Sequence, residues 1–421
     1  MNSKNNEKIF DVVVIGAGPA GMIAAISAAT SGSSTILLEK NSRIGKKLLA
    51  TGNGRCNITN RLIEISKYYG DPEFAINIIN MFDQDKTTSF FESLGLLLKE
   101  EDSGRIFPRT NQASSVVNIL ADELAAKKVQ IKTDTEVREI VHTKKFFNIK
   151  TTKGNIIKGN RLIITTGGKA AHQFGSSGDG LFWSKIMKHN ITPIYAALVP
   201  IEIAENWTKD LQGLKVKAMV KALKNSETIA EKFGDVLFTH YGLSGPAIMS
   251  MSRHIAPFIE TDEITLCIDL FPNESLDRID DLLENTFRIN NTKSVKNALI
   301  GILPQKLIPI LLKLSSINEF TKSAEISKKA RNNLILNIKS LKVNVSKIRP
   351  LKEAQVTSGG VCTNEINNET LESKIVDNLF FAGEIINVDA ESGGFNLQWC
   401  WSSGFIAGKS AAKDINYFNK H

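Results

Sequence analysis

Length, composition and charge set the first limits on this protein. The chain has 421 residues, which allows two or three domains at the usual size of roughly 150 residues each. Its hydrophobic fraction of 42% is that of an ordinary globular protein and excludes a disordered or fibrous chain. The formal net charge of +8 is small for this length and serves solubility, although a polyanionic partner stays open.

Signals for disulfides, metals and membranes are missing from the sequence. The four cysteines lie far apart without a C-x-x-C pair, so neither a disulfide framework nor a metal site is predicted. Residues 1–8 are polar and run into a predicted strand, unlike a secretory signal peptide. The most apolar long stretch, 299–317, is interrupted by prolines and lysines. A cytoplasmic protein without a membrane partner is therefore expected.

The chain opens with the pattern of a β-α-β unit. Residues 10–15 (FDVVVI) form a short, β-branched apolar run, which is typical of a buried parallel strand. The string GAGPAG follows at once, and a helix of small residues is predicted over 22–29. A second strand over 35–38 ends in Glu39. Together these elements predict a nucleotide-binding unit.

Three glycines inside this unit predict a dinucleotide site. Gly16 permits a tight turn, Gly18 lets the backbone approach a pyrophosphate, and Gly21 lets helix and strand pack closely. The pyrophosphate would face the free N–H groups at the helix start. Glu39, 18 residues after Gly21, can accept a hydrogen bond from a ribose 2′-OH and would repel a 2′-phosphate. The alternative is a glycine-rich turn without a ligand, which the agreement of strand, glycines, helix and acid disfavours.

The middle of the chain changes its pattern twice. Alternating runs between Val129 and Ile164 predict a β-meander that returns to a central strand at 162–165. Alternation between 191 and about 270 indicates a second, antiparallel β domain, and residues 275–331 have a helical pattern. The predicted domains are a first part of the nucleotide domain at 1–190, an insert at 191–347 with a β-barrel (about 191–273 and 332–347) and helices (about 274–331), and a second part of the nucleotide domain at 348–421.

A glycine-rich element far downstream favours a flavin over a nicotinamide as the bound cofactor. The apolar strand 379–382 leads into Gly383 and Glu384, and the string ESGGFNLQ precedes a helix predicted from about 398 to 414. Glu384 can hold ribityl hydroxyls, and a helix N-terminus aimed at the flavin N1–C2=O edge stabilises the anion formed there on reduction. Gly394 would let the backbone approach the ring. An ordinary glycine-rich loop is the alternative.

Several strings occur along the chain in one order: GAGPAG, TGNGRCNITN, GRIFP, TTGGKA, GSSGDG, LFTHYGLSGPA, TSGGV and AGEIINVDAESGGFNLQWCWSSG. Together they resemble the bacterial NAD(P)/FAD-dependent oxidoreductases grouped with aminoacetone oxidase and the bile-acid-inducible dehydro-bile-acid reductase. The resemblance covers nearly the whole chain. It implies an α/β fold with a Rossmann-like FAD-binding domain of glutathione-reductase type, interrupted by an insert with a β-barrel and a helical subdomain.

The resemblance also implies which residues surround FAD. On the adenosine half these are Gly16, Gly18, Glu39 and Lys40, with the backbone of Val137 at the adenine. On the flavin and ribityl half they are Lys47, Thr51, Gly52, Asn53, Thr166, Gly167, Gly168, Gly383, Glu384, Gly394, Phe395, Asn396 and Leu397. Phe395 stands where many relatives carry Tyr, so no hydroxyl donor is expected at that position.

The residues that carry the chemistry are less sharply indicated. Flavin N5 accepts or donates the hydride, so the protein supplies orientation, electrostatics and access. Asn53 and Arg55 follow the glycines near the predicted ring and can bind an anionic or carbonyl substrate group, whereas Arg55 can equally anchor FAD phosphates or the loop. His240 is a candidate proton donor or a hydrogen-bonded structural residue. Cys56 has no resolving partner nearby in sequence and is predicted to be a buried, inert thiol.

These observations predict an FAD-dependent oxidoreductase that acts on a small or medium organic substrate by hydride transfer at N5. A reductase would take electrons from NAD(P)H that visits the flavin transiently, and an amine-type oxidase would pass them to oxygen. Two alternatives stay open: a flavoprotein that binds or modifies tRNA, and a non-catalytic flavin-binding redox module. A nucleic-acid partner is disfavoured, because the basic segments lack interleaved aromatic residues. The sequence does not indicate an oligomeric state.

Overall fold

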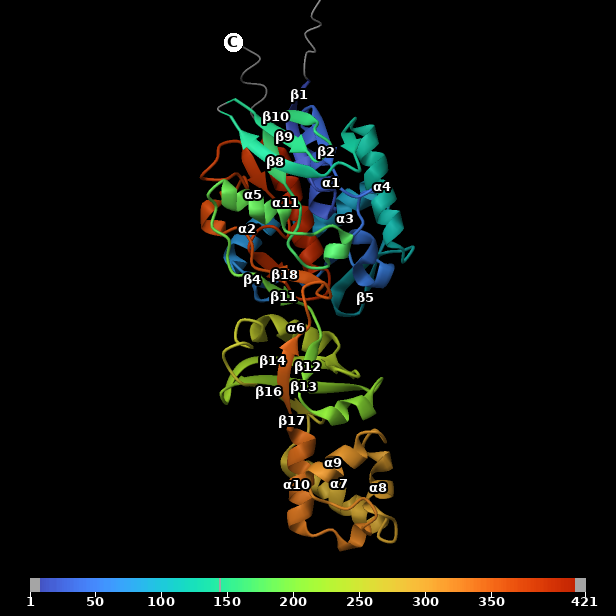
Figure 1. The fold of residues 1–421 in the computed structure, drawn as a ribbon. Helices are drawn as coiled ribbons and strands as arrows, with labels where there is room; N and C mark the ends of the chain where they lie inside the picture. The colour runs from blue at the N-terminus through green and yellow to red at the C-terminus, as the bar shows by residue number, and fades with distance from the viewer. Residues whose placement is uncertain (1–7, 144, 413–421) are drawn as a thin grey trace, which may run out of the picture. The chain divides into compact units, whose positions relative to one another are not determined.

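A computed structural model describes residues 8–143 and 145–412 of the chain (Figure 1). The polar segment 1–7 and the end of the last predicted helix, 413–414, lie outside the described residues. The chain divides into two compact units, Met1–Tyr195 with Val356–His421, and Ala196–Gln355. Each unit has its own hydrophobic core. The predicted insert, 191–347, overlaps the second of these units.

Seven strands form the central sheet of the first unit, in the order β7-β2-β1-β10-β9-β8, with β19 also paired to β10. The strands are β1 (Ile9–Ile15), β2 (Thr35–Leu38), β7 (Gln130–Lys132), β8 (Val137–His142), β9 (Phe147–Thr151), β10 (Ile156–Ile164) and β19 (Leu379–Phe381). Strands β7, β2, β1, β10 and β19 run parallel. Most side chains of β1 and β2 are buried, as expected for parallel strands covered on both faces.

The alternating region between Val129 and Ile164 divides differently from the prediction. Only β8, β9 and β10 form the antiparallel meander, whereas β7 pairs in parallel with β2. The break falls at Asp134, whose left-handed φ of +48° interrupts the strand geometry. Its N–H donates to the carbonyl of Asn41, which ties this turn to the segment after β2. Periodicity alone does not reveal this break, because the side chains on both sides of it alternate.

Small residues bring two helices of the first unit into close contact. A Cβ atom at Gly404 would lie 2.4 Å from the carbonyl oxygen of Ala20, and one at Gly408 would lie 2.2 Å from that of Ala24. These residues belong to α11 (Phe395–Ala412) and α1 (Pro19–Thr30), so the two backbones approach closely. Helix α11 starts at residue 395 rather than the predicted 398. The other helices of this unit are α2 (Pro72–Met81), α3 (Gln84–Ser93), α4 (Ala113–Ala126) and α5 (Asp179–Ile186).

Short strands complete the first unit. They are β3 (Thr59–Asn60), β5 (Leu98–Glu101) and β6 (Arg105–Pro108) in one sheet, β4 (Tyr68–Gly70) and β20 (Val388–Ala390) in another, and β11 (Tyr195–Ala197) and β18 (Val356–Ser358) where the chain passes between the units. Strand β3 lies directly before the polar segment that leads to β4. These strands bring residues around 60 and 390 into the same unit as the glycine-rich turn.

The second unit contains a closed barrel with the strand order β12-β15-β14-β13-β16-β17. Its strands are β12 (Ile201–Ile203), β13 (Lys215–Lys224), β14 (Glu227–Phe238), β15 (Gly242–Ser244), β16 (Ile264–Asp269) and β17 (Leu341–Ile348). Its helices are α6 (Pro246–Ile255), α7 (Leu276–Ile289), α8 (Val295–Ala298), α9 (Ile308–Leu314) and α10 (Lys328–Lys339). Residues 332–339, predicted within the barrel, continue α10, since Leu334, Ile335 and Ile338 are buried at helical spacing.

Candidate active site

The glycine-rich turn between β1 and α1 contains two kinds of glycine. A Cβ atom at Gly16, which has a φ of +101°, would lie 2.7 Å from the carbonyl oxygen of Thr165. One at Gly21 would lie 1.8 Å from the carbonyl oxygen of Gly16. Gly18, the N-cap of α1, has nothing within 4 Å of its Cβ position. Packing therefore requires Gly16 and Gly21, while Gly18 borders open space at a helix start, where an anion can approach the backbone.

Glu39 lies at the end of β2, beside the glycine-rich turn. Its side chain is 8% exposed, and its Oε2 accepts a hydrogen bond of 2.8 Å from the Ala17 N–H. Its Oε1 accepts bonds of 2.8 and 2.7 Å from the backbone and side-chain nitrogens of Asn41. A carboxylate has about four lone-pair sites, so capacity remains for a ribose hydroxyl. The structure thus places Glu39 next to Gly16 and Gly18, where an adenosine ribose would be bound.

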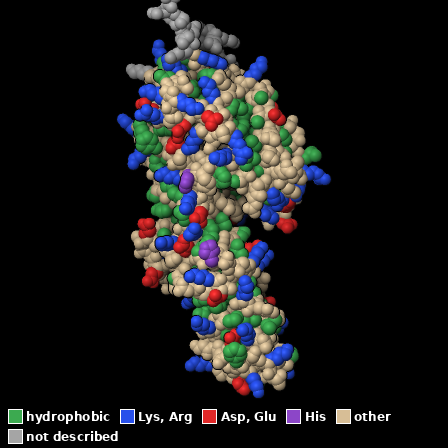
Figure 2. Space-filling view, turned by 45° about the vertical axis from the view of Figure 1, so that its right-hand side comes forward, with side chains coloured by type: hydrophobic (Ala, Val, Ile, Leu, Met, Phe, Trp, Pro, Cys, Tyr) green, Lys and Arg blue, Asp and Glu red, His purple; other side chains and the backbone are tan. Residues whose placement is uncertain are grey.

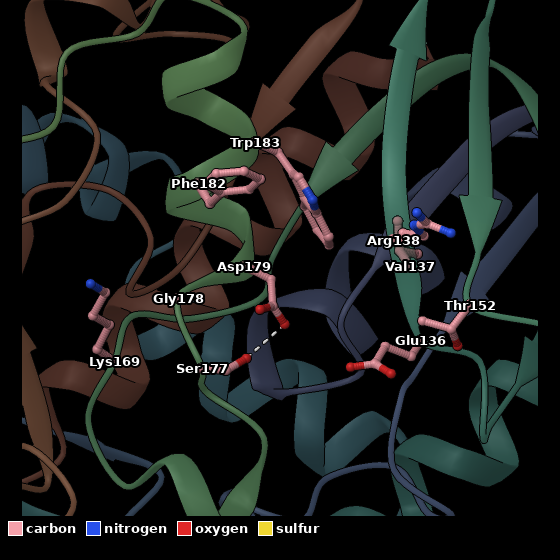
Figure 3. Close-up of a pocket in the computed structure, with 10 residues that line it drawn as sticks. All are labelled: Glu136, Val137, Arg138, Thr152, Lys169, Ser177, Gly178, Asp179, Phe182 and Trp183. Carbon is pink, nitrogen blue, oxygen red and sulfur yellow. Dashed lines mark hydrogen bonds between the residues drawn. The ribbon is translucent and has the colours of Figure 1, made fainter.

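A surface pocket of about 460 Å³ opens beside this end of the sheet (Figure 3). Its lining residues lie at and directly before the start of β8, directly after β9, in the loop between β10 and α5, and in α5 itself: Glu136, Val137, Arg138, Thr152, Lys169, Ser177, Gly178, Asp179, Phe182 and Trp183. At its edge, Lys40 Nζ forms an ion pair of 2.9 Å with Asp179 and donates to the Ser177 hydroxyl. Figure 3 shows Phe182 and Trp183 projecting from α5 above Asp179. Val137 and Asp179, the ion-pair partner of Lys40, thus line the same pocket.

Lys47 and Glu384 meet although 337 residues separate them in the chain. Their ion pair measures 2.8 Å, with exposed side-chain fractions of 23% and 17%. Glu384 Oε1 also accepts the Thr357 N–H at 2.9 Å, and Lys47 Nζ donates to the carbonyl of Ala170 at 3.4 Å. The Thr357 hydroxyl accepts the N–H groups of residues 169 and 170. This cluster joins the glycines after β10 to the loop after β19.

The loop after Lys47 has an unusual backbone. Gly52, Asn53, Gly54 and Cys56 all have left-handed φ angles, between +55° and +83°. Glycine adopts such angles freely, but for Asn53 and Cys56 they are strained, and strain of this kind clusters at functional sites. Gly52 and Asn53 are exposed, whereas Cys56 is fully buried. The loop therefore presents its Gly-Asn-Gly tip to solvent and anchors its base in the core.

The start of α11 offers backbone rather than side chains. Phe395 is 4% exposed and packs edge-on against Tyr68, with ring centroids 6.2 Å apart. The Asn396 amide bonds to the backbone N–H and carbonyl of Ala390 at 2.9 and 2.8 Å. Leu397 is 9% exposed. Since these side chains are engaged inside the protein, residues 395–397 can reach a ligand through the unpaired N–H groups of the first helical turn.

The three residues predicted for chemistry lie in different surroundings. The Arg55 guanidinium stacks on Phe107, 4.1 Å from the ring centroid, and donates to Glu101 and to Asn111. These contacts favour the loop-anchoring alternative for Arg55, while Asn53 remains exposed. His240 follows β14 in the second unit, where its ring packs edge-on against Tyr241. It is not among the residues that the first unit assembles.

Two buried polar atoms near the predicted set, Asn57 Oδ1 and Thr166 Oγ1, have no hydrogen-bond partner among the described residues. The sequence predicted Thr166 as a cofactor residue but missed Asn57. Such orphaned groups, together with the open space at Gly18, fit a site that takes a polar cofactor such as FAD. Thr357 and Asp179 were also missed as partners of predicted residues. A signal for Asn57 existed, since it belongs to the string TGNGRCN.

Two further findings concern other classes of site. No helix within the described part of the chain is long and apolar enough to cross a membrane. Over the same residues, no group of three or more His, Cys, Asp and Glu side chains could hold a metal ion.

The chain is similar to known proteins over nearly its full length. It is 37% identical over 404 residues to the 3-dehydro-bile acid delta(4,6)-reductase of Clostridium scindens, covering 95% of this chain and 98% of that protein. It is 30% identical over 414 residues to the ribosomal RNA dihydrouridine synthase of Escherichia coli, covering 96% and 99%. Among solved structures, the open conformation of a flavocytochrome c3 fumarate reductase shares the fold, with a TM-score of 0.51 and 15% identity over 98% of this chain and 79% of that one.

These relationships confirm the predicted Rossmann-type FAD-binding fold and the predicted enzyme class, an FAD-dependent oxidoreductase. They also confirm the resemblance drawn from the ordered strings. Residues 10–410 match the family described as HI0933-like protein Rossmann domain. The chain belongs to this HI0933-like family.

Proposed function

We propose that this protein uses FAD to reduce a C=C double bond conjugated to a carbonyl group, with NAD(P)H as the electron donor. The observation that carries the proposal is the 37% identity over 404 residues to a named delta(4,6)-reductase. The name of the Escherichia coli relative, a dihydrouridine synthase, fits the same chemistry, because dihydrouridine is uridine with its ring double bond saturated. Both names describe addition of two hydrogens to an electron-poor double bond.

Residues of the first unit would hold successive parts of the cofactor. Gly18 and the start of α1 would receive the pyrophosphate, and Glu39 the adenosine ribose. The pocket at Val137 would take the adenine. The ion pair of Lys47 and Glu384 would lie at the ribityl chain. When bound, FAD supplies hydride transfer at N5, and the protein supplies position and access.

Reduction of such a bond also requires a proton at the second carbon. The donor predicted from the sequence, His240, lies in the second unit and stays a prediction. Asn53, which is exposed at the tip of the left-handed loop, is proposed to bind the substrate carbonyl. Arg55 is proposed to hold that loop through Phe107 and Glu101 rather than to touch the substrate.

Anaerobic rapid mixing tests the proposal. The purified protein is expected to show flavin absorption bands that NADPH or NADH bleaches, and a conjugated enone should then restore them. An unconjugated alkene serves as the matched control and should leave the flavin reduced. Bleaching by an amine, combined with no reaction toward either nicotinamide, would instead establish the oxidase version and refute the reductase.

A uridine in RNA is the second candidate substrate. It is motivated by the 30% identity to the ribosomal RNA dihydrouridine synthase and by the net charge of +8. Figure 2 shows Lys and Arg side chains scattered among Asp and Glu on the visible face, rather than gathered in one patch. The sequence predicted tRNA as the alternative partner. The similarity to a ribosomal RNA enzyme extends this alternative to RNA in general, and ribosomal RNA is the first substrate to test. Incubation of unmodified ribosomal RNA with NADPH and the protein, followed by mass spectrometry for dihydrouridine, distinguishes this substrate from a free enone.

A further inference from the structure

The side-chain amide of Asn57 stands out among the polar groups of the first unit. Within residues 8–143 and 145–412 nothing bonds to its Oδ1, although this atom is shielded from solvent. The amide of nearby Asn60 is fully engaged: it donates to the Gly393 carbonyl at 2.9 Å and accepts the Leu62 N–H at 2.8 Å. A buried acceptor left unpaired is costly, so proteins seldom keep one unless a water, ion or ligand supplies the donor.

Two parts of the flavin site meet at Asn57. A Cβ atom at Gly394, directly before α11, would lie 3.0 Å from Asn57 Oδ1. A Cβ atom at Gly52, in the left-handed loop, would lie 3.0 Å from the Asn57 backbone nitrogen. Both glycines have positive φ angles, +102° and +57°. Asn57 therefore joins the strained loop to the start of α11, and its amide borders the place where the resemblance puts the flavin ring.

The backbone at the start of α11 offers hydrogen-bond donors but no acceptors. The unpaired N–H groups of a first helical turn can only donate, so they suit the N1–C2=O edge of a flavin. The same pyrimidine portion of the ring carries a donor, N3–H, between the two carbonyls C2=O and C4=O. A helix start cannot satisfy this donor. A side-chain amide can, because it carries an acceptor oxygen beside a nitrogen with two donor hydrogens.

We propose that the Asn57 amide pairs with the pyrimidine edge of the FAD isoalloxazine ring. Its oxygen accepts the hydrogen bond from N3–H, and its NH₂ group donates to a neighbouring ring carbonyl. This makes Asn57 a cofactor-positioning residue rather than a catalytic one. The proposal rests on FAD as the cofactor and is independent of the substrate that the reduced flavin meets.

Binding of FAD and of FAD methylated at N3 to the apoprotein tests the pairing. The methyl group removes the one donor that Asn57 would meet and leaves the rest of the cofactor unchanged. From the worth of one buried hydrogen bond, the wild-type protein should bind FAD about tenfold more tightly than N3-methyl-FAD, as measured by flavin fluorescence titration. Asn57→Ala should bind the two cofactors with dissociation constants equal to within about twofold, since the acceptor is gone and space is opened.

Controls separate this proposal from the assignment of FAD itself. Asn80→Ala, at an exposed position of α2, should keep the wild-type preference for FAD. Equal affinity of the wild-type protein for both cofactors would overturn the pairing and indicate a water at Oδ1, and so would a preference that survives in Asn57→Ala. If Asn57→Ala does not fold, Asn57→Leu, which is close to Asn in shape and has no acceptor, gives the same comparison. Failure to bind either cofactor would remove the FAD assignment together with the pairing, whereas failure of the enone assay alone would leave the pairing standing.

Discussion

Burial decides the chemistry of the cysteines in the first unit. Burial raises the pKa of Cys56 to about 12, although a hydrogen bond with Thr51 acts in the opposite direction. Burial also raises the pKa of Cys400 to about 12, and the nearby charge of Glu384 adds to this effect. Because the folded state prefers the neutral thiols, their effect on stability is neutral below about pH 9 and becomes destabilising as the pH rises toward 12. The structure thus agrees with the prediction of an inert Cys56.

Alkylation of the native protein at pH 8 tests whether burial makes a thiol unreactive. With a pKa about 12, roughly one thiol in ten thousand is ionised at this pH, and the thiolate is the reactive form. The fully buried Cys56 should therefore stay unmodified by iodoacetamide, while the half-buried Cys267 is labelled, as read by peptide mass spectrometry. In guanidinium all four cysteines should react. Labelling of native Cys56 as fast as Cys267 would contradict the assignment.

At the scale of elements, the turn between β1 and α1 contains one glycine needed for packing, Gly21, and another proposed for ligand binding, Gly18. Gly21 lies against the carbonyl of Gly16, so it lets the helix sit on the strand. Gly18 has a φ of −76°, which any residue can adopt, and its Cβ position is open. No contact within the described residues therefore requires glycine at residue 18. We propose that glycine is required there by the close approach of a pyrophosphate.

Two alanine substitutions test this separation. Gly18→Ala should leave the thermal stability of the apoprotein within about 0.5 kcal/mol of wild type but weaken FAD binding by roughly tenfold or more. Gly21→Ala, whose Cβ atom would lie 1.8 Å from an oxygen, should destabilise the apoprotein by more than about 3 kcal/mol. Calorimetry of the apoprotein and flavin titration measure the two effects. Unchanged FAD affinity in Gly18→Ala would refute the pyrophosphate site.

The start of α11 is held by a second device, a buried polar network. Gln398 is fully buried and accepts the Thr59 hydroxyl at 2.5 Å. The two hydrogens of its Nε2 are shared among three acceptors at 2.9 to 3.0 Å, the Phe82 carbonyl, the Thr87 hydroxyl and the Ser402 hydroxyl. A buried network in which the polar groups are paired is rigid and specifies one arrangement. The helix start that would face the flavin is therefore fixed by residues from β3, from α3 and from the turn after α2.

For the whole molecule, the second unit has the properties of an inserted domain. Its barrel is closed and it has its own core. The chain enters and leaves it at neighbouring points, because the Gln355 N–H donates to the Leu198 carbonyl at 3.3 Å and the Arg349 N–H to the Pro200 carbonyl at 3.2 Å. A unit with adjacent ends and a separate core can fold without its host.

Residues 196–355 expressed alone should therefore fold cooperatively. A sigmoidal thermal transition by circular dichroism, together with dispersed amide signals in NMR, is the expected result. The isolated unit should not bind FAD, and the full-length chain is the control for flavin titration. A chain of these residues that stays unfolded, with no transition, would show that the first unit is needed for its stability.

The sequence by itself determined the parts that depend on local geometry. A buried strand, a glycine turn and a small-residue helix follow one another within the first 40 residues, so their types and order could be predicted from periodicity and glycine chemistry. The ordered strings identified the family and, with it, the inserted barrel and helices. The location of α11 was also predicted, although its start was placed three residues too late, because the glycines before it suit either a loop or a helix start.

Only the tertiary structure decided which distant groups meet. The partners of Arg55 lie 46 and 56 residues away, and those of Lys47 include Glu384, 337 residues away. It also distinguished Gly18 from Gly21 and left Asn57 Oδ1 without a hydrogen-bond partner among the described residues. Periodicity reports which face of an element is apolar, and it contains no information on the distance between elements. That distance is set when the core packs, and it decides whether a polar group is paired inside the protein or remains available to a ligand.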